Sequence, residues 1–106
     1  MIKINNYKTM DNSNSVTHNV YFEGKVQSLG LETEKGKATV GVMKSGTYTF
    51  STSSAEKMIV ISGTMTVRLP GQDWAKYSAQ QEFDIVAGVS FEVTCDADVA
   101  YICYYE

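Results

Sequence analysis

The chain has few of the residues from which simple metal or thiol sites are built. Of its 106 residues, one is His, two are Cys and one is Pro. Zinc takes four nitrogen or sulfur ligands, often from close cysteine pairs, whereas Cys95 and Cys103 are eight residues apart with only His18 to join them. We therefore expect two reduced, buried thiols and neither a zinc site nor a disulfide. His18 is expected to be a bystander, and Cys103 lacks a nearby second His that would make it a nucleophile.

The chain also lacks an excess of positive charge and any long apolar run. Nine Lys and Arg against twelve Asp and Glu give a formal charge of −3, whereas a nucleic-acid surface needs a basic patch to neutralise phosphates. No apolar stretch approaches the roughly 18 residues of a membrane helix. The first residues are too polar for a secretory signal. We expect one cytoplasmic domain that binds neither nucleic acid nor membrane.

What the chain does have is apolar residues at alternate positions, the period-two pattern of β-strands. From Asn19 onward, turn residues interrupt this pattern about every 8–12 residues, which predicts about eight short strands. Eleven Val and six Ile agree with strands. The segment 58–61 is apolar on both faces, so we place it centrally. Ser62-Gly63 is expected to form a tight hairpin.

Barrels and double-sheet jelly rolls bury many short strands without long open edges. The sequence therefore predicts an all-β fold, a single β-barrel or jelly roll. Residues 1–18 have no sustained apolar period and are expected to form a flexible N-terminal arm, and residues 19–106 the barrel.

Several short motifs resemble the first conserved segment of a cupin. Glu56 and Gly63 keep the cupin spacing of a glutamate, six residues and a glycine. More specifically, the chain resembles the small single-domain cupins assigned as pyrimidine/purine nucleoside phosphorylases. The matching motifs span roughly residues 20–105: Tyr21-Phe22-x-Gly24-Lys25-Val26, Gly41-Val42-Met43, Gly46-x-Tyr48-x-Phe50-x-Thr52, Glu56-x-Met58, Leu69-Pro70, Trp74, Phe83, Phe91 and Tyr101-x-Cys103.

The chain departs from the cupin pattern in its metal ligands. Metal-binding cupins carry two His and a Glu in the first segment and another His in the second, whereas this chain has only Glu56 among hydroxyls and Phe50, and no second-segment His. We expect no metal and no cofactor. Many members of the resembled family also have Gly and then Pro in the second segment, where this chain has Gln80 and Val86.

The resemblance implies phosphorolysis, in which a nucleoside and phosphate give a free base and a pentose 1-phosphate. Its partners would be a purine or pyrimidine nucleoside and inorganic phosphate, and small cupins commonly pair as homodimers through sheet edges. Such a reaction needs an anion site, a tolerated positive charge on the sugar and a hydrogen-bond donor to the base. Accepting both base classes favours stacking over edge recognition.

Glu56 is the predicted catalytic residue, because it precedes a deeply buried strand and a carboxylate there is costly unless it is paired or functional. The alternative is a surface pair with Lys57. For phosphate we expect Lys37 and the hydroxyls of Ser51, Thr52 and Ser53, the alternative being solvated surface. For substrate binding we expect aromatic side chains that otherwise serve as core or interface: Tyr48, Phe50, Trp74, Phe83, Phe91 and Tyr101.

Two other functions stay open from the sequence. A metal-free cupin that binds a nucleoside- or sugar-phosphate-like ligand without turnover has the same stacking pocket and anion site. A structural protein that dimerises through aromatic strands would use Tyr104 and Tyr105, since Tyr is enriched at interfaces.

Overall fold

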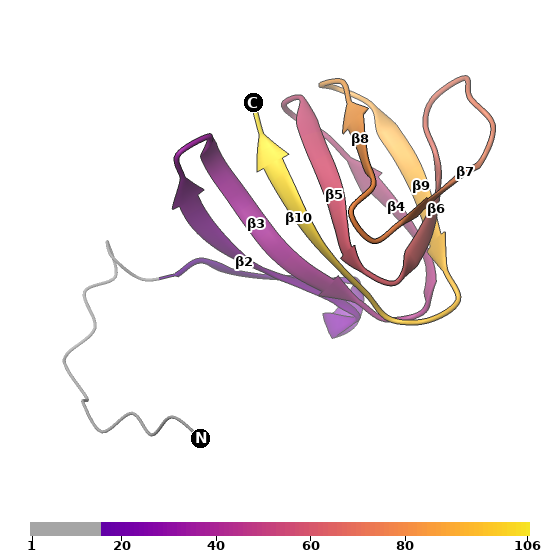
Figure 1. The fold of residues 1–106 in the computed structure, drawn as a ribbon, viewed down its shortest axis with the longest axis horizontal. Helices are drawn as coiled ribbons and strands as arrows, with labels where there is room; N and C mark the ends of the chain where they lie inside the picture. The colour runs from indigo at the N-terminus through magenta and orange to yellow at the C-terminus, as the bar shows by residue number, and fades with distance from the viewer. Residues whose placement is uncertain (1–15) are drawn as a thin grey trace.

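Two antiparallel β-sheets face each other in the computed structural model, which describes residues 16–106 (Figure 1). The six-stranded sheet has the order β1-β2-β3-β10-β5-β8, and the four-stranded sheet the order β4-β9-β6-β7. The strands of the described residues are β1 His18–Tyr21, β2 Val26–Thr33, β3 Gly36–Met43, β4 Gly46–Ser51, β5 Glu56–Ser62, β6 Thr64–Arg68, β7 Ala75–Ser78, β8 Glu82–Ile85, β9 Ser90–Cys95 and β10 Val99–Tyr105.

The all-β prediction is confirmed, with ten strands within residues 16–106 in place of about eight. Most of the predicted N-terminal arm lies outside the described residues. Its last residues take part in the sheet, because β1 begins at His18 and the Gly30 N–H donates to the Thr17 carbonyl at 2.8 Å. The part of the chain that the structure describes holds no helix long and apolar enough to cross a membrane.

The core lies between the inner faces of the two sheets. Because side chains alternate along a strand, every second residue points inward, as the burial pattern of β9 shows. β5 lies between β10 and β8, so its predicted central place is confirmed. The buried cluster consists of Val26, Met43, Tyr48, Met58, Val60, Met65, Val67, Phe83, Ile85, Phe91, Val93, Cys95, Val99, Tyr101 and Cys103.

Strand register sets which inner side chains are neighbours. On β10, Tyr101 lies opposite Gly41 of β3 and Val60 of β5. Two residues further, Cys103 lies opposite Thr39 and Met58, and Tyr105 then lies opposite Glu56. The inner face of the large sheet is therefore apolar toward one end of β10 and polar toward the C-terminal end.

The predicted hairpin at Ser62-Gly63 is wrong, because the turn there carries the chain from one sheet to the other. β5 pairs with β10 and β8, whereas β6 pairs with β7 and β9. Gly63 has φ +91°, and a Cβ at this position would lie 2.8 Å from the Asp98 carbonyl oxygen. The turn thus needs glycine both for its backbone conformation and for close approach to the next loop.

A left-handed turn, Phe22–Gly24, separates β1 from β2. Phe22 has φ 51° and Glu23 φ 57°, values that are uncommon outside glycine. The turn places the Phe22 ring beside two aromatic rings of β4, with its centroid 4.9 Å from that of Tyr48 and 5.5 Å from that of Phe50.

Candidate functional site

A cavity of about 240 Å³ opens between the two sheets at the polar end of β10. Aromatic rings, hydroxyls and one carboxyl group surround it. Its lining residues are Tyr21, Ser28, Phe50, Ser51, Ser53, Glu56, Met58, Phe91, Tyr101, Cys103 and Tyr105. We refer to it below as the barrel cavity.

Glu56 provides the carboxyl group of the barrel cavity. It begins β5, is half-buried, and accepts a hydrogen bond from the Cys103 thiol at 3.2 Å. Burial raises the pKa of the Glu56 carboxyl, an effect that the Cys103 hydrogen bond opposes. Lys57 pairs instead with Glu82, on the outer face at 3.7 Å. The carboxyl group thus faces the cavity without a cation beside it among the described residues.

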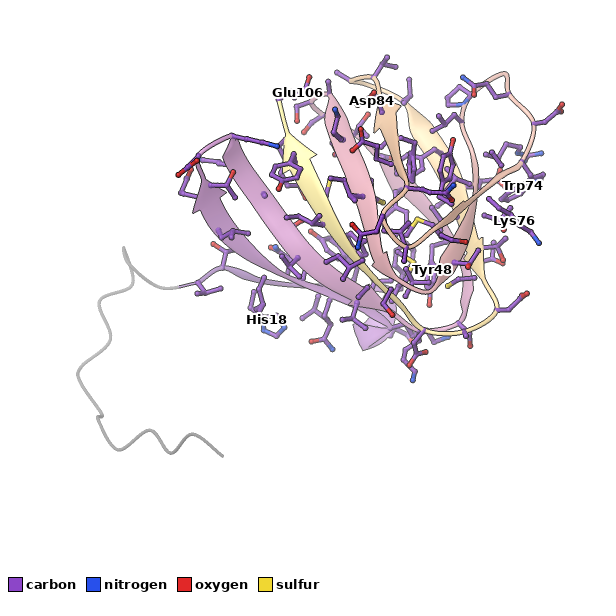
Figure 2. The ribbon with its side chains drawn as sticks, in the orientation of Figure 1. His18, Tyr48, Trp74, Lys76, Asp84 and Glu106 are labelled. Carbon is purple, nitrogen blue, oxygen red and sulfur yellow. The ribbon has the colours of Figure 1, made fainter. Side chains whose placement is uncertain are left out.

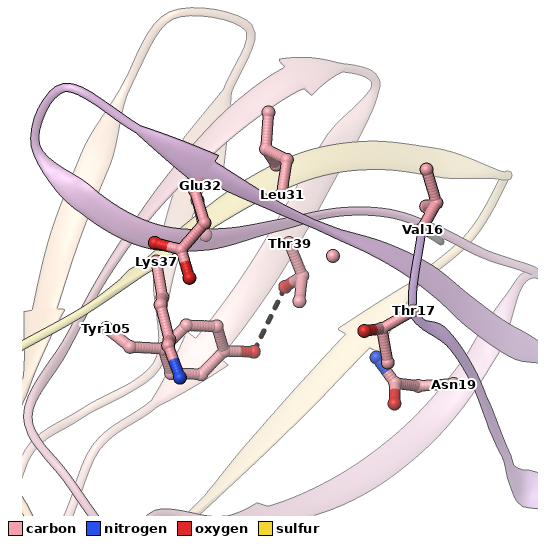
Figure 3. A pocket seen from close by; sticks show the side chains of 10 residues that line it. Val16, Thr17, Asn19, Leu31, Glu32, Lys37, Thr39 and Tyr105 are labelled. Atoms are coloured by element: carbon pink, nitrogen blue, oxygen red, sulfur yellow. Dashed lines mark hydrogen bonds between the residues drawn. The ribbon is translucent and has the colours of Figure 1, made fainter. Parts of the chain in front are cut away.

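A second, more open cavity of about 560 Å³ lies beside the first and shares Tyr105 with it (Figure 3). Here the Tyr105 and Thr39 hydroxyls form a hydrogen bond of 3.0 Å. Lys37 of β3 and Glu32 of β2, which lie opposite each other in the strand register, line the same cavity. Burial raises the pKa of Tyr105 to about 12, so that its hydroxyl keeps its proton at neutral pH.

Of the predicted substrate-binding aromatics, the structure brings Phe50, Phe91 and Tyr101 together in the barrel cavity. The Phe50 and Phe91 rings stack with centroids 5.7 Å apart. Because Phe50 is only partly buried, this pair presents an aromatic surface to the cavity.

The other predicted aromatics lie elsewhere. Tyr48 is buried and its hydroxyl donates to the Lys44 carbonyl at 2.6 Å. Phe83 is buried against Tyr77, their centroids 4.6 Å apart. Trp74 lies on the outside near β7, under the guanidinium of Arg68 at 5.1 Å (Figure 2). None of the three lines the barrel cavity.

The four predicted phosphate-binding residues are also divided. Ser51 and Ser53 line the barrel cavity, and Ser51 shares a hydrogen bond of 3.0 Å with Ser90. Thr52 points the other way: its buried hydroxyl donates to the Val86 carbonyl at 2.8 Å and accepts from the Val89 N–H at 3.1 Å. Lys37 belongs to the second cavity. Thr52 thus fastens the loop that carries the two serines.

Sequence reasoning missed several lining residues. Tyr105 and Cys103 alternate with Tyr101, so the period-two rule signals that they share its face. Ser28 follows Val26 on the same face of β2, but nothing local marks it as a site residue. Tyr21 is the last residue of β1, directly before the left-handed turn, which has no clear sequence signal.

The two departures from the resembled family lie around β8. Gln80 has φ 75°, so this chain places Gln in a backbone conformation that favours glycine. Its N–H donates to the Val60 carbonyl at 2.8 Å, which holds the turn against β5. Val86 is exposed and supplies the carbonyl that Thr52 binds. The loop therefore closes here without the Gly and Pro.

The donor groups in the described residues do not match a cupin metal centre. Within residues 16–106, no three His, Cys, Asp or Glu side chains gather around one point. Cys95 and Cys103 are free and buried, as the sequence predicts. Burial raises the pKa of the Cys103 thiol, so Cys103 is a hydrogen-bond donor to Glu56.

The two-sheet fold is the fold of the cupins. A RmlC-like cupin from Shewanella frigidimarina superposes with a TM-score of 0.66 over 93% of this chain and 88% of its own, at 14% identity. A protein of unknown function from Vibrio parahaemolyticus is closer, with a TM-score of 0.83 and 40% identity over 87% of this chain and 99% of its own.

Sequence comparison defines the family within this class. The profile of the pyrimidine/purine nucleoside phosphorylase family matches residues 16–105. A pyrimidine/purine nucleoside phosphorylase from Magnetococcus marinus is 48% identical, covering 82% of this chain and 95% of the relative, and one from Marinobacter nauticus is 45% identical, covering 85% and 98%. The chain belongs to the pyrimidine/purine nucleoside phosphorylase family, and the resemblance seen in its motifs is confirmed.

Proposed function

We propose that the chain is a broad-specificity nucleoside phosphorylase that converts a purine or pyrimidine nucleoside and phosphate into the free base and a pentose 1-phosphate. The observation that carries the proposal is the barrel cavity of a member of this family, in which a carboxyl group, two serine hydroxyls and stacked aromatic rings meet. The relatives named for this activity support the reaction type.

Each side of the barrel cavity suits one part of the substrate. The Phe50–Phe91 pair offers a π face, which any base stacks on regardless of its edge. The Glu56 carboxylate suits the sugar, because cleavage of the bond at C1′ builds positive charge there. Ser51 and Ser53 are the phosphate ligands within this cavity, and Lys37 adds a positive charge from the neighbouring one.

This assignment uses only side chains and needs no metal. Three of the predicted site residues support the cavity walls and do not contact substrate: Tyr48, Phe83 and Thr52. Trp74 lies outside the site. A location in the cytoplasm, expected from the sequence, stays a prediction.

The alternative is a cupin that binds a nucleoside- or sugar-phosphate-like ligand in the same cavity without turnover. The specific observation in its favour is that, among the described residues, Glu56 is the one carboxyl group lining the barrel cavity, whereas glycoside-cleaving sites commonly use two. Binding alone would raise the melting temperature without releasing product.

The decisive experiment measures free base released from uridine, inosine and adenosine, with and without phosphate, by the wild type and Glu56→Gln. We expect release that depends on phosphate, persists in a chelator, and falls about 100-fold or more in the variant, since the amide cannot balance positive charge at C1′. Glu82→Gln is the matched control, because its carboxylate lies on the outer face of β8 beside Lys57.

Each result distinguishes the two functions. Full activity in Glu56→Gln would keep the reaction and remove Glu56 from it. Absence of base release from every nucleoside, together with thermal stabilisation by nucleoside or sugar phosphate, would establish the binding protein instead.

A further inference from the structure

Tyr101 holds an unusual position on the inner face of β10. Its ring lies directly on Gly41 of β3: a Cβ at this glycine would be 2.4 Å from Tyr101 Cζ and 2.5 Å from Oη. With the ring in this position, no side chain larger than hydrogen fits beneath it. Gly41 therefore makes room for the Tyr101 phenol against the sheet. Tyr101 itself lines the barrel cavity.

The Tyr101 hydroxyl has no hydrogen-bond partner within residues 16–106, although only 5% of the residue is exposed. The neighbouring polar side chains are already paired: Tyr105 with Thr39, Cys103 with Glu56, Ser28 with Asn19. Every fully enclosed side-chain nitrogen or oxygen of the described residues has a partner. The unpaired Tyr101 oxygen is therefore not fully enclosed, and it opens into the cavity as a donor available to a ligand.

The charge state of this hydroxyl is well defined. Burial raises the pKa of Tyr101 far above its ordinary value, and the nearby Tyr105, Cys103, Tyr21 and Glu56 act in the same direction. The phenol thus remains protonated throughout the pH range in which a nucleoside enzyme works.

Purine and pyrimidine bases share one hydrogen-bond acceptor close to the glycosidic bond. It is O2 in pyrimidines and N3 in purines, the two acceptors that occupy equivalent places in the minor groove of DNA. The other edges of the bases differ in their donors and acceptors. A single fixed donor facing this shared acceptor would hold either base class without reading its identity.

We propose that the Tyr101 hydroxyl donates a hydrogen bond to the shared acceptor, O2 of a pyrimidine or N3 of a purine, and thereby lets one cavity use both base classes. The inference rests on the proposed function, whose substrate recognition it specifies. It makes Gly41 a positioning residue, since its missing side chain sets where the phenol lies.

The donor also acts during the reaction. As the C1′–N bond breaks, its electron pair moves to the base, and an oxygen of hydrogenphosphate forms the new bond to C1′. Negative charge spreads to O2 or N3 and strengthens the hydrogen bond from Tyr101, which keeps its proton. The proton that hydrogenphosphate carried passes to the base, leaving neutral base and the pentose 1-phosphate dianion.

The test combines a side-chain change with a substrate change. Tyr101→Phe is compared with wild type on adenosine and on 3-deazaadenosine, in which C–H replaces N3. We expect kcat/KM to fall about tenfold or more on adenosine and on uridine, but to change less than about twofold on 3-deazaadenosine, where no hydrogen bond remains to be lost. A purely structural role for the hydroxyl would instead lower kcat/KM by the same factor on adenosine and on 3-deazaadenosine.

Tyr105→Phe is the matched control, because the Tyr105 hydroxyl is already hydrogen-bonded to Thr39. It should change kcat/KM equally on adenosine and 3-deazaadenosine.

A second measurement uses no variant. Adenine should inhibit the wild type more strongly than 3-deazaadenine does, while 1-deazaadenine should match adenine. Equal loss by Tyr101→Phe on both nucleosides, or equal inhibition by adenine and 3-deazaadenine, would overturn the inference. Failure of the proposed function is a separate result, since the wild type would then release no base.

Discussion

Among single residues, Glu56 is placed where function and stability conflict. Its carboxyl group is half-buried against Cys103 and opposite Tyr105, without a cation to stabilise its charge among the residues described. Burial raises its pKa, which means that folding favours the protonated carboxyl. Groups held in such surroundings are common at active sites, where stability is given up for chemistry.

The raised pKa of Glu56 predicts a pH-dependent effect on folding. Below the ordinary value of 4.5, the carboxyl is protonated in both the folded and the unfolded chain and costs nothing; as pH rises through the folded pKa, the folded chain must hold an unfavourable charge. We therefore expect Glu56→Gln to melt at a higher temperature than wild type at pH 7, with the difference disappearing near pH 4. Melting curves across this range, followed by circular dichroism, provide the measurement.

Glu82→Gln serves again as the control, because its carboxylate is exposed and paired with Lys57. A Glu56→Gln variant that is less stable than wild type at pH 7 would contradict this account of the carboxyl group.

At the level of secondary-structure elements, short irregular turns decide how the strands join. The turn Phe22–Gly24 ends β1 and places the Phe22 ring beside Tyr48 and Phe50, and Gly63 sends the chain from β5 into the other sheet. Both turns depend on positive φ, which costs about 1–3 kcal/mol at residues other than glycine.

The sheet crossing at Gly63 gives a prediction that separates two costs. Gly63→Ala must accept φ +91° and a Cβ 2.8 Å from the Asp98 carbonyl oxygen, whereas Gly71→Ala has φ +72° and an open surrounding. We expect Gly71→Ala to lower the free energy of unfolding by about 1 kcal/mol, and Gly63→Ala to lower it by about 1–2 kcal/mol more, as measured by urea denaturation. Equal losses in the two variants would show that the contact with the Asp98 carbonyl relaxes freely.

At the scale of the whole molecule, the outer face of the large sheet is unusually apolar. Leu29, Val40, Ile102 and Ile59 form one continuous row across β2, β3, β10 and β5. Leu29 is 52% exposed and Val42, on the same face of β3, 51%. Exposed apolar patches of this kind commonly mark protein–protein contacts, so this face, in place of the sheet edge expected from the resemblance, is the candidate contact of a homodimer.

We predict that the chain is a homodimer which buries this outer face. Sedimentation velocity should give about twice the 11.7 kDa of one chain, and Val40→Glu should shift the protein to the monomer, because a charge on each copy would be buried in the interface. Val86→Glu is the control, since Val86 is 67% exposed in the loop after β8, outside that row. A monomeric wild type, or a Val40→Glu dimer, would rule out this face.

Much of the architecture was predictable because it follows from local alternation. The apolar positions of 58–61 and the alternation that gives Tyr101 and Cys103 a shared face are properties of neighbouring residues along one strand. Family membership was equally readable, since motif order and spacing are contained in the chain itself.

What one strand cannot specify is its partner and the sheet to which it belongs. The pairing of β10 with both β3 and β5 places Cys103 beside Glu56 and the Tyr101 ring on Gly41, and the crossing at Gly63 sends β6 into the opposite sheet. Thr52 is turned away from Ser51 and Ser53 by its hydrogen bonds to Val86 and Val89, a contact between segments far apart in the sequence. Sequence by itself determined the strands, the class and the family, because these depend on local pattern and composition. Tertiary structure alone decided which side chains meet in the cavity, because contacts between distant strands depend on register and sheet packing.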